Sequence, residues 1–291
     1  MTRTAMIRKT LIRSTTARAL CALILCLFSI PALAQEGEGP LNNTTPKGIT
    51  VDEVVKRFAD KEKEFKQARE QYTWTQSVKI QSLEGNAVDG EYQEVFDVLF
   101  DDKGKRIEHV KFAPQNTLTR FDMTKEDFDD IRHGMPFTVV SEDIPLYDIR
   151  YRGQQQEDEL NCYVFDLGPK KIDKGKRYFE GRIWVDDHDF QIVKTFGKMV
   201  PDLVKSKGNE NLFPRFTTWR EQIDGKYWFP TYTKVDDNLH FTMGDIHTRQ
   251  VVRYENYRRF GSNTRVIFEG QELKKEEPPK GDAPKNETNK K

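Results

Sequence analysis

Histidines and carboxylates are the residues of this sequence whose chemistry would suit catalysis or metal binding. None of the five histidines belongs to a His-Glu-x-x-His pattern or stands at zinc spacing from a cysteine: His109, His133, His188, His240 and His247. The sequence also lacks a Gly-x-Ser-x-Gly elbow, a P-loop and a Gly-x-Gly-x-x-Gly fingerprint. We therefore predict no catalytic residue, no metal site, no cofactor and no enzyme activity.

Two alternatives to this prediction stay open. The 47 acidic residues place some carboxylates close together in any fold, so an exported hydrolase stays a hypothesis. It is the least favoured one, because no sequence pattern brings histidines and carboxylates together. The acidic run from Asp186 to Asp189 resembles a cation site, but it lies between two apolar segments, as turn residues do. We interpret it as a hairpin turn. Cys162 has no activating motif beside it, and we expect it to be buried in a strand.

A secretory leader occupies residues 1 to 34. Five basic residues precede an apolar run from 19 to 30, which is followed by Pro31 and Ala32-Leu33-Ala34. A run of about a dozen residues is too short to span a bilayer. We predict cleavage after Ala34 and export to the periplasm, with secretion as the alternative, for a protein that is not integral to the membrane.

The mature chain is mildly acidic. Removing 34 of 291 residues leaves 257, and losing five of the 47 basic residues leaves 42 against 47 acidic ones, a net charge of −5. This balance disfavours nucleic acid as a partner. Residues 35 to 49 are rich in Gly, Pro, Asn and Thr and indicate a flexible lead-in, and residues 271 to 291 indicate a disordered charged tail. The folded domain is expected over residues 50 to 270.

Hydrophobic periodicity predicts a mainly β (α+β) fold. Apolar residues recur at helical spacing over 50 to 70, after the capping pattern Thr50-Val51-Asp52-Glu53, and a short helix is predicted from Thr124 to Gly134. From Tyr72 to 81 the period becomes two, as in a strand. Similar runs lie at 91–100, 105–112, 146–152, 160–167, 176–185, 190–197, 214–223, 226–235, 238–243 and 246–260. About eleven strands with short turns predict an antiparallel meander that curls into a barrel or half-barrel.

One face of the first strands is the candidate binding surface. Alternation places apolar side chains together on it, and these residues are the candidates for lining an apolar cavity: Trp74, Val78, Ile80, Phe96 and Val98. An ordinary packed core fits the same pattern.

Several strand motifs resemble those of the LolA-like outer-membrane lipoprotein-sorting proteins. The resemblance covers residues 145 to 260 best, through Leu167-Gly168-Pro169-Lys170, Ile183-Trp184-Val185-Asp186 and Trp228-Phe229-Pro230. It implies an unclosed half-barrel whose concave side is covered by helices. The sequence differs from the classical carrier in its length and in an insertion around 200 to 214.

The resemblance also implies a function. It points to a periplasmic protein that binds a lipid or an acylated lipoprotein in an apolar concave cavity. The alternative is a structural or interaction module of the cell envelope whose partners are other envelope proteins.

Overall fold

The computed structural model describes residues 39–101, 104–206 and 209–260. The predicted leader, the first residues of the lead-in and everything after 260, including the predicted tail, lie outside the described residues. The chain divides into two compact units, and each takes two segments of the sequence. Unit 1 contains residues up to Glu62 together with Phe137–Pro201, and unit 2 contains Lys63–Pro136 together with the segment from Asp202 onward.

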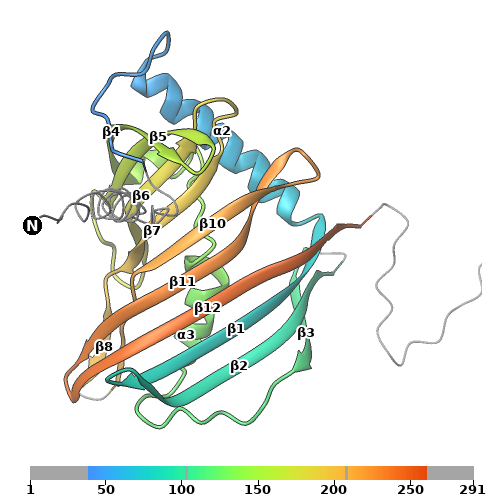
Figure 1. The fold of residues 1–291 in the computed structure, drawn as a ribbon, viewed down its shortest axis with the longest axis vertical. Helices are drawn as coiled ribbons and strands as arrows, with labels where there is room; N and C mark the ends of the chain where they lie inside the picture. The colour runs from blue at the N-terminus through green and yellow to red at the C-terminus, as the bar shows by residue number, and fades with distance from the viewer. Residues whose placement is uncertain (1–38, 102–103, 207–208, 261–291) are drawn as a thin grey trace, which may run out of the picture. The chain divides into compact units, whose positions relative to one another are not determined.

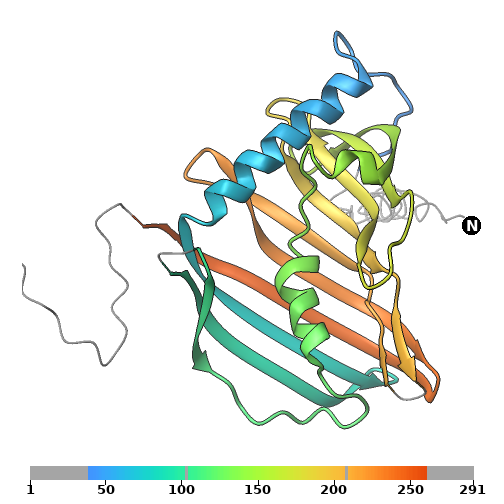
Figure 2. The same cartoon turned by 180° about the vertical axis from the view of Figure 1, so that it is seen from behind.

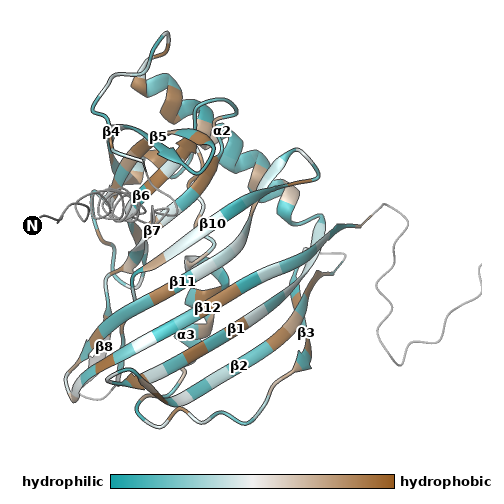
Figure 3. Cartoon of the chain, viewed as in Figure 1, coloured by the Kyte–Doolittle hydropathy of each residue, from teal (hydrophilic) through white to brown (hydrophobic). Residues whose placement is uncertain are grey.

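Unit 2 is built on six antiparallel strands (Figure 1). Their order is β3-β2-β1-β12-β11-β10, and their bounds are Tyr72–Glu84 for β1, Ala87–Phe100 for β2, Arg106–Phe112 for β3, Phe216–Ile223 for β10, Tyr227–Phe241 for β11 and Gly244–Arg259 for β12. Polar and apolar residues alternate along much of β1 (Figure 3). The buried residues of β1 therefore share one face of the sheet. A separate hairpin comprises β8 (Leu203–Ser206) and β9 (Asn209–Asn211).

Unit 1 holds four antiparallel strands in the order β7-β6-β5-β4. Their bounds are Tyr147–Glu157 for β4, Leu160–Pro169 for β5, Tyr178–Asp186 for β6 and Ile192–Val200 for β7. Part of the expected lead-in lies against β4, because Asn42 and Gln154 exchange two backbone hydrogen bonds of 2.8 Å. Gly153 has a φ of 131° and a Cβ there would lie 2.2 Å from the Asn42 carbonyl oxygen, so this contact requires glycine.

A buried ion pair lies inside unit 1. The Lys194 ammonium on β7 donates to both carboxylate oxygens of Glu157 at the end of β4, at 2.9 and 3.0 Å, and both side chains are almost fully buried. The ammonium also lies 4.7 Å from the centre of the Trp184 ring. Trp184 in turn donates to Gln155 Oε1 at 2.9 Å. These contacts hold the lysine in one position.

Helix α2 (Val51–Arg69) contributes to both units. Thr50 caps its start, since Oγ1 accepts from the Glu53 amide at 3.2 Å. In unit 1, Phe58 packs edge-on against Phe165 of β5, with ring centres 5.5 Å apart. In unit 2, Phe65 packs against Phe229 of β11 at 5.4 Å. The apolar stripe read from the sequence therefore forms core in each unit.

The second helical segment lies over one face of the unit 2 sheet (Figure 2). It consists of α3 (Lys125–Asp129) and the π-helical turn η1 (Asp130–Gly134), and α3 begins with a complete capping box between Thr124 and Asp127. Phe128 packs against Tyr92 of β2 at 5.5 Å, and the Thr218 hydroxyl of β10 donates to the Met135 carbonyl at 2.9 Å. A short 3₁₀ turn, η2 (Ile144–Leu146), precedes β4 in unit 1.

The structure confirms the predicted mainly β, antiparallel fold class, in which the strands do not close into a barrel and helices pack on a sheet face. One detail of the strand prediction is wrong, and one hairpin was not predicted. The runs 226–235 and 238–243 form one strand, β11, because the polar residues between them pair across the hairpin instead of turning: Asp236 lies opposite Arg249 and Asn238 opposite His247. The insertion at 200–214 contains the β8–β9 hairpin, which we did not predict because its polar residues break the apolar alternation of a strand.

Candidate functional site

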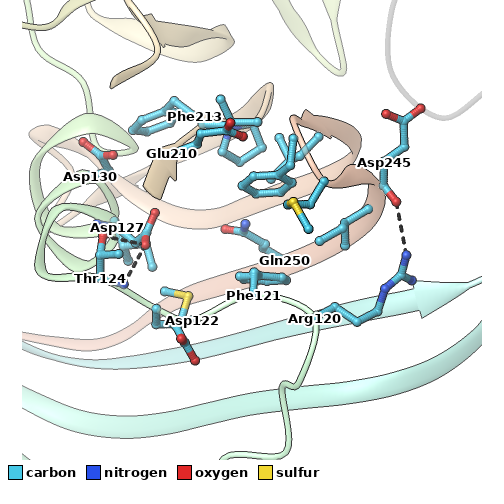
Figure 4. A pocket seen from close by; sticks show the side chains of 18 of the residues that line it. Arg120, Phe121, Asp122, Thr124, Asp127, Asp130, Glu210, Phe213, Asp245 and Gln250 are labelled. Carbon is cyan, nitrogen blue, oxygen red and sulfur yellow. Dashed lines mark hydrogen bonds between the residues drawn. The ribbon is translucent and has the colours of Figure 1, made fainter. Parts of the chain in front are cut away.

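A cavity of about 610 Å³ lies in unit 2 between the α3–η1 segment and the end of the β11–β12 hairpin (Figure 4). Three stretches of chain line it: residues 119–135, residues 210–214 and residues 239–250. The third stretch continues the sheet face that carries Ile80, because Gln250 on β12 is the register partner of Ile80 on β1. The sheet thus supplies the base of the cavity, and the helical segment and its preceding loop supply a wall.

The lining is rich in large apolar side chains. Phe121 stacks on Phe241, with ring centres 6.4 Å apart and planes at 19°, and Phe213 packs against Phe216 at 5.8 Å. The remaining apolar lining residues are Met123, Ile131, Met135, Leu212, Leu239, Met243 and Ile246. Methionine side chains are flexible and polarisable, so a lining with three of them adapts to the shape of an apolar ligand.

The described lining residues carry more acidic than basic groups. Arg120 is the one basic side chain among them, against five carboxylates: Asp122, Asp127, Asp130, Glu210 and Asp245. Several of these carboxylates have a structural role. Asp127 caps α3 by accepting from the Thr124 amide at 2.7 Å and also contacts Asn211. Glu210 accepts from the Thr242 amide at 2.8 Å in the β11–β12 turn.

Arg120 fixes the loop that precedes α3. Its guanidinium donates to the carbonyl of Asp245 at 3.1 Å (Figure 4). It also donates to the carbonyl of Leu83 at 2.9 Å and to the carboxylate of Asp89 at 3.2 Å. These acceptors belong to the end of β1 and to the starts of β2 and β12. The loop and the Phe121 ring are therefore tied to three strands of the same sheet.

The five residues predicted to line a cavity are all buried in unit 2: Trp74, Val78, Ile80, Phe96 and Val98. They share one face, since Trp74 pairs with Val98, and Phe96 pairs with the inward-facing Gln76. None of them lines the 610 Å³ cavity, although Trp74 lines a much smaller one. Their role in ligand binding stays a prediction. The cavity-lining residues Phe121, Met123, Phe241 and Met243 were missed because they come from a loop and a hairpin end, where no periodicity marks them.

Ile80 tests whether this face is packed core. We expect Ile80→Ala to lower the free energy of unfolding by about 2–5 kcal/mol, because the fully buried side chain would leave a void. Urea denaturation checks this result. Val88→Ala on the exposed part of β2 is the control and is expected to change stability by less than about 0.5 kcal/mol. Unchanged stability with weaker ligand binding would instead make Ile80 a cavity residue.

The other chemically capable residues have structural surroundings. Asp186 ends β6, and its carboxylate accepts from the Asp189 amide at 3.1 Å, so the acidic run is a turn as predicted. Cys162 is buried in β5, and burial raises the pKa of its thiol. His240 and His247 each contact a carboxylate across the hairpin, Asp245 at 2.9 Å and Asp236 at 2.6 Å. Among residues 39–101, 104–206 and 209–260, no three His, Cys, Asp or Glu side chains gather as metal ligands would.

Comparison with known proteins finds neighbours among solved structures. A DUF1329 family protein from Desulfovibrio piger is 15% identical with a TM-score of 0.35, over 72% of this chain and 95% of that one. The LolA superfamily protein NE2245 from Nitrosomonas europaea is 16% identical with a TM-score of 0.32, over 69% and 94%. MucB is 10% identical with a TM-score of 0.25, over 69% and 92%. One of these neighbours, NE2245, is described as a member of the LolA superfamily, the broad family whose motifs the strands of this chain resemble.

At these identities the likeness concerns the fold alone. No protein-family model and no curated protein matches the chain. In the described part of the chain, no helix combines the length and the apolar character needed to cross a membrane.

Proposed function

We propose that this chain is an exported protein of the cell envelope that binds an apolar chain, a lipid or the acyl chain of a lipoprotein, in the 610 Å³ cavity of unit 2. The observation that carries the proposal is the lining of that cavity, where phenylalanine and methionine side chains lie beside polar ones around a partly open space of the size that small-molecule ligands occupy. The secretory leader read from the sequence supports export. The role is binding, with no catalytic step.

The acidic lining residues restrict the ligand's polar end. A free fatty acid would bring its carboxylate among Asp122, Asp127 and Asp130, which is electrostatically unfavourable. An ester, an amide or an amine-bearing head group avoids this repulsion. The proposed ligand is therefore an acyl chain with a neutral, zwitterionic or cationic end.

Binding of an uncharged fluorescent probe tests the proposal. We expect mature protein to enhance the fluorescence of N-phenyl-1-naphthylamine, and Phe121→Ser to weaken this binding about tenfold, because loss of the ring removes apolar contact. The matched control is Phe112→Ser, which changes an exposed phenylalanine on β3 outside the cavity. Equal binding by both variants, or no fluorescence enhancement with the unaltered protein, would contradict the proposal.

A protein segment is the second candidate ligand. The five carboxylates and single arginine of the lining favour a partner with basic as well as apolar side chains. A fluorescent peptide rich in Lys and Leu would then bind tightly at low salt and weakly at high salt. Salt-insensitive binding of the uncharged probe, with no binding of the peptide, favours the lipid.

A further inference from the structure

A second, much smaller cavity lies in the interior of unit 2 and is surrounded by arginines. Its volume is about 10 Å³, and its lining includes Arg69, Trp74, Gln76, Arg106, Arg132 and Tyr257. The three guanidinium groups come from the end of α2, from β3 and from η1. None of these lining residues lines the larger cavity.

The positive charge in this cluster exceeds its negative charge. Two carboxylates pair with its three guanidinium groups: Glu108 accepts from Arg132 at 2.7 and 2.8 Å and from Arg106 at 2.9 Å, and Asp129 lies 3.6 Å from Arg132. Within the part of the chain that the structure describes, no carboxylate forms an ion pair with Arg69. Burial lowers the pKa of both Arg69 and Arg106, and neighbouring guanidinium charges add to the effect. The cluster therefore retains uncompensated positive charge.

Aromatic rings hold the arginines in place. The guanidinium carbons of Arg69 and Arg106 lie 5.8 and 5.4 Å from the centre of the Trp74 ring. Tyr257, another lining residue, is fixed by donating to the Pro230 carbonyl at 2.7 Å. Such cation–π contacts orient a guanidinium without neutralising its charge.

Gln76 supplies an unused hydrogen-bond donor. Its side chain is 99% buried, and its Oε1 atom accepts from Arg106 at 3.2 Å and from Trp74 Nε1 at 3.4 Å. These two donors fix the amide so that Nε2 is its free side, and Nε2 has no acceptor among the described residues. A buried donor without an acceptor is costly. Rotating the amide by 180° would not remove this cost, because its NH₂ group would then face the two donors Trp74 Nε1 and Arg106.

We propose that this cavity binds one monovalent anion of the size of chloride, held by Gln76 Nε2 and the guanidinium groups of Arg69 and Arg106. An anion satisfies the amide donor and offsets the excess charge, whereas a water molecule satisfies only the donor. The small volume of about 10 Å³ favours a single monatomic anion over a larger polyatomic anion such as sulfate. The site is independent of the proposed lipid cavity.

Thermal melting at fixed ionic strength tests the site. We expect the melting temperature of the mature protein to rise by several degrees as sodium chloride replaces sodium gluconate, because an anion that binds the folded state stabilises it. Gln76→Glu should place a carboxylate in the cavity, raise the melting temperature in gluconate and abolish the chloride response. Arg69→Gln should weaken the chloride response about tenfold or more in apparent affinity, and it serves if Gln76→Glu fails to fold.

Gln250→Glu is the matched control, because it makes the same change at another buried glutamine of unit 2 that does not line this cavity. It should keep the chloride response. Crystals soaked in sodium bromide should show an anomalous peak within hydrogen-bond distance of Gln76 Nε2. Equal melting temperatures in chloride and gluconate, or no bromide peak in the cavity, would overturn the proposal in favour of a bound water.

Discussion

Phe58→Asp is expected to lower the free energy of unfolding by at least about 5 kcal/mol, enough to unfold a protein of ordinary stability. Phe58 is fully buried in unit 1, where its ring packs against Phe165. The substitution removes that contact, leaves a void and places a carboxylate in an apolar environment. The first two effects alone cost about 3–5 kcal/mol, and the buried charge adds to them.

Circular dichroism during heating measures this effect, with Phe58→Leu as the control. Leucine keeps the apolar character and most of the volume, so the control should lose less than about 2 kcal/mol. A melting temperature that Phe58→Asp leaves unchanged would mean that α2 does not dock through this face.

Lys194→Met is expected to destabilise the protein by about 3–5 kcal/mol, because it leaves the Glu157 carboxylate buried without the ammonium group that contacts both of its oxygens. Methionine fills a similar volume, so lost packing contributes little. Denaturant unfolding at neutral pH measures the change.

The double variant Lys194→Met/Glu157→Leu separates a buried charge from lost packing. It removes both charges, and we expect it to recover most of the lost stability. If the single and double variants were equally unstable, the cost would come from packing around Trp184 and not from the isolated carboxylate.

The sequence predicts those parts of the fold that depend on local periodicity. The alternation from Tyr72 to 81 identified β1, and the caps at Thr50 and Thr124 located the starts of α2 and α3 within one residue. These signals are reliable because each is enforced by burial or hydrogen bonding within a single element.

Features that depend on register were outside the reach of the sequence. The partners of His240 and His247 are carboxylates on the facing strand or across the turn, at separations that only the hairpin pairing decides. The arginine cluster collects side chains that are distant in sequence, Arg69, Arg106 and Arg132, around one tryptophan. The 610 Å³ cavity likewise takes Phe121 from a loop and Phe241 from a strand end, so neither periodicity nor a motif marks it.

The pairing of β1 with β12 decides the order in which the chain can fold. Tyr72 lies opposite Arg259, so β1 can pair with β12 only after the sequence between them has been synthesised. A chain that leaves a ribosome or a translocation channel N-terminus first completes unit 1 at Pro201, while unit 2 still lacks β10, β11 and β12. Throughout that interval one edge of β1 is open to pairing with other chains. Pairing of β12, the last of the described strands to be synthesised, therefore covers this edge of β1 and removes it as a site of aggregation.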